Sequence, residues 1–270
     1  MARRGNLFTV SENHSVREAV IVFILTSGIQ NIESYNDLIK PGGCLNEYFQ
    51  VYDKIKLSSS SIIVKQNNKT EIEQSIQKGF KLSALREGKV TEVFQFLPEK
   101  NISSFTYNTI SYQSWKKFLD SSIKIFRTIG NYDEGLEVQA IGVMYIDEFY
   151  FKNSSSYNPK EIFDNKSKYI PNSILNSDFA DFNLNTHHKH TNTKREYIEN
   201  IGIKIFDDEN LKKIRINGSV MIPVPKHTIN DYLNSKIGDT EDILNFGHDQ
   251  NKNLLIDILS ESAQQLIGIV

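Results

Sequence analysis

The sequence has one cysteine, one tryptophan, six prolines and no long apolar run among its 270 residues. Cys44 has no second cysteine to pair with, so we expect a reducing compartment, the cytoplasm. The longest apolar run, residues 19–25, is far shorter than the roughly 20 residues that a membrane helix needs. Arg17 and Glu18 directly precede that run, which is atypical of a secretory signal. We therefore predict a cytoplasmic protein that does not insert into a membrane.

The sequence also lacks an excess of charge of either sign, with 31 Lys and Arg against 33 Asp and Glu. Without such an excess, a nucleic-acid role would require a local basic patch. The sequence contains no phosphate-binding loop, dinucleotide fingerprint or Gly-x-Ser-x-Gly elbow, and the segment 41–44 lacks the Lys and Ser/Thr of a phosphate loop. We therefore predict no cofactor and favour a non-enzymatic protein, while an enzyme that uses dispersed residues remains an alternative.

Hydrophobic periodicity in the first half predicts strands, then a long helix. The continuous apolar pattern of 17–26 is typical of a central strand covered on both faces. After it we expect a short helix at 32–40, a weaker strand at 61–66, a meander of strands at 80–85, 90–97 and 102–107, and a helix at 111–130. Ser111 is the expected N-cap of this helix, and Gly130 its expected end.

The second half repeats this order. We expect a long strand at 137–151, a helical turn around 162–163, strands at 197–206 and 211–216, a further strand to Val224, and a helix at 240–267. Asn217 and Gly218 stand between two alternating apolar segments, and this pair predicts a type I′ hairpin turn.

The repeated order predicts an α+β fold of two similar halves, residues 1–132 and 133–270. Each half would hold a strand, a short helix, an antiparallel meander and a long C-terminal helix packed on the sheet, in a helix-grip-like arrangement. We expect the halves to form one compact unit that arose by internal duplication; chance repetition of a meander and a helix is the alternative.

Segments spread over nearly the whole chain resemble a sporadically distributed family of uncharacterised prokaryotic proteins. The resemblance is carried by residues 17–20, 80–83, 112–118, 141–147 and the pair Gly247-His248. The family's central strand usually reads Ile-Gly-Leu-Arg-Tyr-Ile-Asn, whereas this chain has Met144 and Asp147 at the Arg and Asn positions. The family's sporadic distribution is similar to that of defence, toxin-neutralising or immunity genes.

Histidines and acids offer few catalytic or metal-binding combinations. His188 and His190 would share one face of a strand and are weak candidate metal ligands, with Asp178 and Asp181 nearby. Two ligands are too few for a metal centre, so we expect a solvated cluster and no metal. His248 is expected to be a hydrogen-bonded histidine at the edge of the core. Adjacent acids in a strand, Asp147 and Glu148, would point to opposite faces and could not act on one bond.

Two groups of basic residues are candidate contact surfaces. Lys116, Lys117, Lys124 and Arg127 would lie on the outer face of the first long helix and could form a nucleic-acid patch. Lys212, Lys213 and Arg215 would decorate an edge strand at 211–216 and could accept an acidic partner strand.

These observations favour a cytoplasmic binding protein that engages a protein partner or a second copy of itself. The resemblance suggests that it acts as an accessory or neutralising component of a bacterial defence or toxin-antitoxin pair. A small-molecule sensor with a cavity between sheet and helix is one alternative, because such packing commonly leaves an apolar space. A nucleic-acid-binding module is the other.

Overall fold

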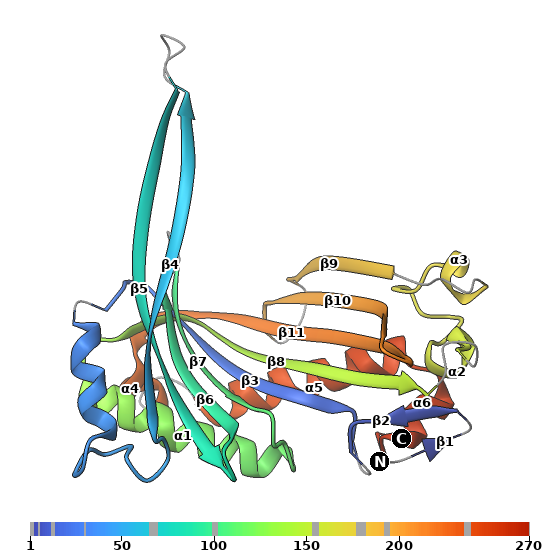
Figure 1. Cartoon of the computed structure of the whole chain (residues 1–270), viewed down its shortest axis with the longest axis horizontal. Helices are drawn as coiled ribbons and strands as arrows, with labels where there is room; N and C mark the ends of the chain where they lie inside the picture. Colours follow the sequence, from blue (N-terminus) through green and yellow to red (C-terminus); the bar gives the residue numbers. More distant parts are fainter. Residues whose placement is uncertain are drawn as a thin grey trace.

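The computed structural model describes residues 3–4, 6–11, 14–29, 31–64, 70–98, 102–152, 157–176, 182–191, 195–234 and 239–269. These residues form an α+β protein in which helices pack against one large antiparallel sheet (Figure 1).

The sheet contains eleven strands in the described part of the chain, nine of them in the continuous order β4-β5-β6-β7-β3-β8-β11-β10-β9. The strands are β1 (Arg3–Arg4), β2 (Leu7–Thr9), β3 (Val16–Leu25), β4 (Val51–Val64), β5 (Thr70–Arg86), β6 (Lys89–Pro98), β7 (Ser103–Thr109), β8 (Glu137–Phe151), β9 (Phe182–His190), β10 (Tyr197–Asp208) and β11 (Leu211–Thr228). The helices are η1 (Ile32–Ile39), α1 (Trp115–Tyr132), α2 (Pro159–Ile162), α3 (Asn172–Leu175), α4 (Ile229–Leu233), α5 (Thr240–Ile258) and α6 (Glu261–Leu266).

Strands β3 and β8 pair with each other at the centre of the sheet, and the apolar pattern of 17–26 predicted the central position of β3. Ala19 opposes Tyr145, Phe23 opposes Ile141, and the side chains of all four are buried. Strand β7 lies on the other side of β3, and β11 lies on the other side of β8. The two apolar strands therefore tie the earlier and later parts of the chain into one sheet.

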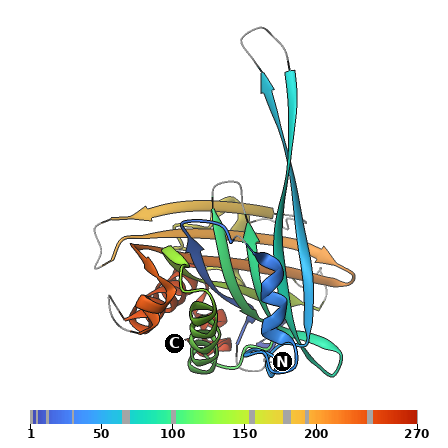
Figure 2. The ribbon, with the colours of Figure 1, turned by 90° about the vertical axis from the view of Figure 1, so that its left-hand side faces the viewer.

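Helices α1 and α5 cover one face of this sheet (Figures 1 and 2). The Phe126 ring of α1 stacks on the Phe23 ring of β3 at a centroid distance of 4.2 Å. On α5, Gly247 lies so close to β8 that an added Cβ would come within 3.1 Å of the Val143 side chain. Apolar side chains from both helices thus close the core against β3 and β8.

The first long helix begins and ends later than predicted. Its N-cap is Ser114, whose hydroxyl accepts a hydrogen bond from the Lys117 backbone, so Ser111 does not cap it. Gly130 does not end it, because the helix continues to Tyr132. The Gly130 carbonyl instead accepts a hydrogen bond from the Asn230 side chain, and the missing side chain makes room for that contact with the segment that forms α4.

The last helix is two helices, whereas the sequence pattern predicted one at 240–267. Helix α5 ends at Ile258, and Leu259 forms an isolated β-bridge with Phe163. Ser260 then caps α6 by accepting a hydrogen bond from the Ala263 backbone. The break occurs because the Leu259 bridge and this new cap satisfy the backbone groups that a continuous helix would have used.

The predicted turn at Asn217 and Gly218 is wrong, since both residues lie inside β11. Asn217 pairs with Gly202 on one side and Ile146 on the other, and Gly218 does not adopt a positive φ. Glycine is needed there for a different reason: α5 packs so tightly on β11 that a Cβ would lie 2.8 Å from the Asn251 Oδ1 atom. The strands predicted at 211–216 and to Val224 are therefore one strand.

A long hairpin formed by β4 and β5 projects from the sheet, and the sequence pattern did not predict its extent (Figures 1 and 2). Its register runs from Val51 opposite Ser83 to Val64 opposite Thr70. The strands expected at 61–66 and 80–85 are only parts of it. Serine, lysine and glutamine dilute the alternation of apolar residues that normally marks a strand.

In the described part of the chain, no helix combines the length and the apolar character required to cross a membrane.

Substitution of Gly218 by Ala tests the close approach of α5 to β11. The added methyl group must displace Asn251 or Leu254, so we expect the variant to lose about 1–3 kcal/mol of unfolding free energy in denaturant titrations. Asn217→Ala, at an exposed strand position, is the control and should stay within about 0.5 kcal/mol of the wild type. A larger loss in Asn217→Ala than in Gly218→Ala would contradict this packing.

Candidate ligand-binding site

A cavity of about 290 Å³ lies where the central strands meet helices α1 and α5. Val16 is the first residue of β3 and Ser15 directly precedes it, while Tyr145 and Asp147 come from β8 and His248 from α5. The complete lining is His14, Ser15, Val16, Tyr112, Trp115, Tyr145, Asp147, His248, Asn251, Lys252, Leu255, Ile267 and Ile269. The lining is largely apolar and aromatic with a few polar groups, as is typical of small-molecule sites.

Asp147 is the most deeply buried acid of this cavity, with 1% of its surface exposed. The Ser15 hydroxyl donates a hydrogen bond of 2.6 Å to its Oδ1 atom. Ser15 is itself fixed by the backbone, because its carbonyl accepts a hydrogen bond from the Glu148 amide at 2.9 Å. Burial raises the pKa of the Asp147 carboxyl to about 6, and the Ser15 hydrogen bond opposes this rise only partly.

Aromatic rings form one wall of the cavity. Trp115, in the first turn of α1, stacks on the His248 ring at 4.4 Å with an interplanar angle of 7°. The Trp115 indole donates a hydrogen bond of 2.6 Å to the Asn245 side chain, which fixes the plane of the ring. The Tyr145 hydroxyl and His248 Nδ1 share a hydrogen bond of 2.9 Å. Burial lowers the pKa of His248, so its imidazole is neutral at pH 7.

Tyr112 and His14 form the opposite part of the lining. A ring nitrogen of His14, Nε2, lies 3.0 Å from the Tyr112 carbonyl oxygen, and the two rings meet edge to face at 5.4 Å. The Tyr112 ring also meets the Tyr145 ring edge to face, at 5.9 Å. Burial lowers the pKa of His14, and backbone hydrogen bonds to its ring oppose this change only partly. Burial, and more weakly the Asp147 charge, raise the pKa of Tyr112 to about 12.

Asn251 anchors α5 beside the cavity. Its side-chain amide donates hydrogen bonds to the Val143 carbonyl at 3.0 Å and to the Gly247 carbonyl at 2.9 Å. The bond to the Val143 carbonyl joins α5 to β8, at a place where glycine residues allow the helix to lie close to the sheet. The distance between His248 on α5 and Tyr145 on β8 is therefore set by the core packing.

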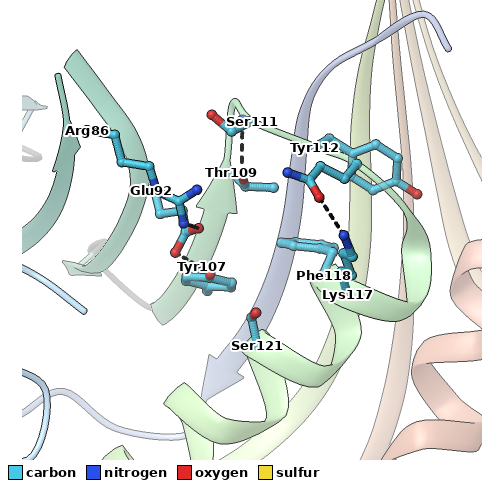
Figure 3. A pocket seen from close by; sticks show the side chains of 10 residues that line it. Arg86, Glu92, Tyr107, Thr109, Ser111, Tyr112, Lys117, Phe118 and Ser121 are labelled. Carbon is cyan, nitrogen blue, oxygen red and sulfur yellow. Dashed lines mark hydrogen bonds and ion pairs between the residues drawn. The ribbon is translucent and has the colours of Figure 1, made fainter. Parts of the chain in front are cut away.

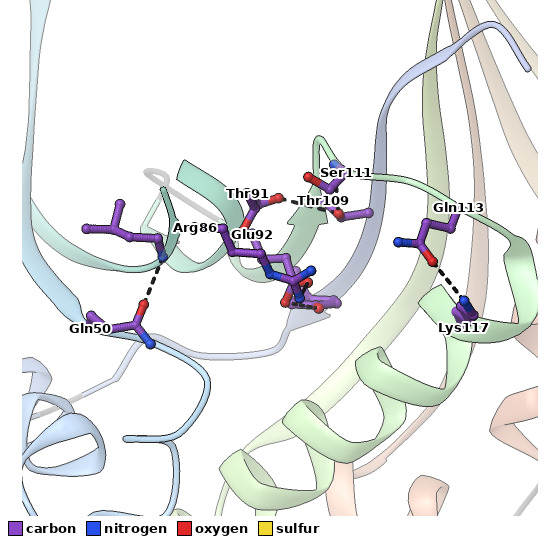
Figure 4. A network of polar contacts seen from close by, with 10 residues as sticks. Gln50, Arg86, Thr91, Glu92, Thr109, Ser111, Gln113 and Lys117 are labelled. Carbon is purple, nitrogen blue, oxygen red and sulfur yellow. Dashed lines mark hydrogen bonds and ion pairs between the residues drawn. The ribbon is translucent and has the colours of Figure 1, made fainter. Parts of the chain in front are cut away.

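A second, smaller cavity of about 140 Å³ lies between the ends of β6 and β7 and the start of α1 (Figure 3). Its polar side chains are engaged with one another: Tyr107 donates to Glu92 at 2.8 Å, and Arg86 lies 3.6 Å from the same carboxylate. Lys117 donates to Gln113 at 2.8 Å (Figure 4). This internal pairing makes the second cavity a weaker candidate than the first.

The histidine cluster lies on β9, the last strand of the continuous sheet order. His190 stacks on Tyr197 at 4.3 Å, and its Nε2 atom lies 3.6 Å from Glu199. His188 is exposed and meets the Tyr169 ring edge to face. Within the described residues, no group of three His, Cys, Asp or Glu side chains is placed to hold a metal ion. Asp178 and Asp181, the nearby acids, lie outside the described residues.

The basic residues of 212–215 do not lie on an edge strand, so that part of the prediction is wrong. Strand β11 pairs with β8 and β10 along its length. The cations have acidic neighbours: Lys212 lies 2.8 Å from Asp207, Lys213 lies 2.5 Å from Asp208, and Arg215 lies 2.9 Å from Glu148. These residues therefore offer no open backbone edge to a partner strand.

The basic residues of α1 lie on its exposed face, as predicted, but two of them contact other parts of the protein. Lys124 lies over the Tyr48 ring at 5.0 Å, and Arg127 donates to the Leu233 carbonyl at 3.2 Å. Lys116 and Lys117 are exposed in the first turn.

His248 lies at the edge of the core beside Tyr145, as the sequence predicted. The sequence did not identify Asp147, Ser15 or His14 as parts of one site. Asp147 and Glu148 do serve opposite faces, since Asp147 lines the cavity and Glu148 pairs with Arg215. One sequence feature could have indicated the site, namely an acidic residue inside an otherwise apolar strand.

The raised pKa of Asp147 predicts a specific pH dependence of stability. The folded state binds the proton more tightly than the unfolded chain, whose Asp pKa is near 3.8. The contribution of this group to stability is therefore greatest below pH 4, and about 3 kcal/mol of it is lost as the pH rises through 6, at 1.36 kcal/mol per unit of pKa shift. In Asp147→Asn this component disappears, so the free energy of unfolding of the variant relative to the wild type should rise across this range.

Asp120→Asn, which removes an exposed acid of α1 outside the cavity lining, is the control and should keep the wild-type slope. Parallel stability curves of the wild type and Asp147→Asn between pH 4 and pH 7 would show that Asp147 has an ordinary pKa.

Comparison of the chain with protein-family models, with curated proteins and with solved structures found no match. The resemblance to a sporadically distributed prokaryotic family thus stays a prediction.

Proposed function

We propose that the protein binds a small organic molecule in the cavity between β3, β8, α1 and α5. The observation that carries this proposal is the combination of an apolar, aromatic lining with one buried carboxyl group, Asp147. Pockets of this composition bind ligands because ring and aliphatic surfaces supply contact area, while a few polar groups fix the orientation. The volume of about 290 Å³ suits a compact molecule.

The arrangement of the polar groups favours binding over catalysis. Trp115 and His248 are stacked face to face, and Tyr145 holds the His248 Nδ1 atom in a hydrogen bond. These contacts fix the rings as parts of a wall. Asp147 is likewise held by Ser15. A site built in this way positions a ligand without rearrangement, which lowers the entropic cost of binding.

The single tryptophan provides a direct test, because Trp115 lines the cavity and is the only indole of the chain. We expect a low-molecular-mass fraction of cell extract to change Trp115 fluorescence saturably and to raise the melting temperature. Leu255→Phe, which fills the cavity, should abolish both effects, whereas Leu255→Ala, which leaves it open, should retain them. Equal responses of the wild type and Leu255→Phe would place the binding elsewhere and overturn the proposal.

A second candidate function, engagement of a protein partner, is favoured by the projecting β4–β5 hairpin (Figure 2). On this hairpin, Ile76 is 69% exposed and Leu57 is 37% exposed. They occupy adjacent register positions and so point to opposite faces of the hairpin, each of which offers an apolar side chain to a partner. Replacing residues 58–76 by a two-residue turn should abolish co-purification of such a partner without lowering the melting temperature; a partner retained by the shortened protein would contradict this role.

We also propose that the two halves, 1–132 and 133–270, arose by duplication. The arrangement of the sheet supports this origin, because β3 and β8 pair as antiparallel neighbours and the meander of each half returns to its own first strand. A long helix follows each meander, and each contacts the last strand of its own half. The cavity then lies at the junction of the halves, with Trp115 from the first and His248 from the second.

A further inference from the structure

The buried charged residues of the described chain differ in how far neighbouring groups compensate their charge, and this difference indicates the kind of ligand. Four charged side chains are buried there: Asp147, Glu148, Glu199 and Lys212. Glu148 is paired with Arg215 and Lys212 with Asp207, at 2.9 Å and 2.8 Å. Burying an ion is costly unless an opposite charge or a set of hydrogen bonds compensates it. These two pairs follow that rule.

Glu199 is also compensated. It accepts a hydrogen bond of 3.0 Å from the Tyr169 hydroxyl, and its Oε1 atom lies 3.6 Å from His190 Nε2. Asp147 has only the hydroxyl of Ser15, and no cationic group of the described residues forms an ion pair with it. Among the four buried charges, Asp147 therefore has the fewest neighbouring groups that compensate its charge within the described residues.

Asp147 also differs in its position, because it forms part of the cavity wall. The two histidines of the wall do not supply a positive charge at neutral pH. Burial lowers the pKa of both His14 and His248, which leaves the two imidazoles neutral. Lys252 lines the cavity from α5, but its side chain is exposed to solvent. The interior of the cavity therefore carries a negative charge that a ligand can neutralise.

The rings beside Asp147 suit a cation as well. The Tyr112 and Tyr145 rings meet edge to face with their centroids 5.9 Å apart. The Trp115 and Tyr145 rings have an interplanar angle of 59° and a centroid distance of 6.5 Å. The face of a Trp or Tyr ring attracts a cation that lies within about 6 Å of the ring centre, and Trp provides the strongest such interaction. Leu255, Ile267 and the other aliphatic side chains of the lining then remain for an apolar body.

We propose that the ligand is an organic cation, an ammonium group on an apolar or aromatic body, whose charge pairs with Asp147 among the rings of Tyr112, Trp115 and Tyr145. This inference rests on the proposed function and specifies its ligand class. The ammonium group gives Asp147 a partner of opposite charge. Glu148 and Lys212 already have such partners within the protein, Arg215 and Asp207. The apolar body fills the part of the cavity toward Leu255 and Ile267.

The test compares three probes of similar shape that differ in charge: phenethylamine, 2-phenylethanol and 3-phenylpropionate. Each is titrated at pH 8 into the intact protein, with Trp115 fluorescence as the signal. We expect the amine to bind at least about tenfold more tightly than the alcohol, a difference of about 1.4 kcal/mol, and the carboxylate to bind most weakly.

Asp147→Asn, which keeps the size of the side chain, should remove the preference for the amine while the variant remains folded by circular dichroism. Asp120→Asn removes an exposed acid of α1 outside the cavity lining and should keep the preference. A preference for the carboxylate, an amine preference that survives in Asp147→Asn, or no binding of any probe at millimolar concentration would each overturn the cation assignment.

The extract experiment with Leu255→Phe is independent of these probes. A saturable, Leu255-dependent response to cell extract combined with failure of the amine would leave a small-molecule site with a ligand of another class. Failure of both would remove the proposed function together with the assignment.

Discussion

Antiparallel pairing of β3 with β8 is the contact on which the rest of the molecule depends. Both strands are rich in β-branched and aromatic residues, and both are buried along most of their length. Because they are neighbours, every other strand of the continuous sheet must be added outward from them. Helices α1 and α5 then pack on the same face of this central pair, and the candidate site forms where the start of α1 and the middle of α5 meet it.

The same pairing explains how a carboxyl group comes to be buried. Ser15 precedes β3, and its carbonyl accepts a hydrogen bond from the Glu148 amide of β8, so the contact between the two segments extends beyond the start of β3. The register change between Val16 and Glu18 accompanies this contact. Asp147 follows the helix-facing residues Val143 and Tyr145 along the strand, and the alternation of β8 places it inside the protein. A polar residue is thus held in the core by the geometry of its strand.

The periodicity of apolar residues was sufficient to predict those elements whose formation depends on core packing alone. The central position of β3 and the existence of the long helices followed from patterns of apolar residues. The Asn217-Gly218 pair was misleading because glycine has two uses, positive φ and close approach, and in β11 the second applies. The β4–β5 hairpin was missed because its strands project from the body and need no apolar face.

The residues of the candidate site could not be recognised as one group from the sequence. Its residues come from the start of β3, the approach to α1, the end of β8 and the middle of α5, and no short motif spans those positions. Asp147 was recognised only as a member of an adjacent acidic pair. The alternation of a strand places Asp147 and Glu148 on opposite faces of the sheet, which excluded joint chemistry but gave no information about which acid would lack a partner.

The proposed ligand class depends on the ionisation of Asp147, and carbon-13 NMR of its side-chain carboxyl measures this ionisation directly. In the ligand-free protein the carboxyl carbon should titrate with a pKa of about 6. Binding of an amine should move this pKa downward, because a neighbouring positive charge favours the ionised form. A carboxyl that titrates below pH 4 in the free protein, or whose pKa is unchanged by a bound amine, would contradict the pairing of Asp147 with a cationic ligand.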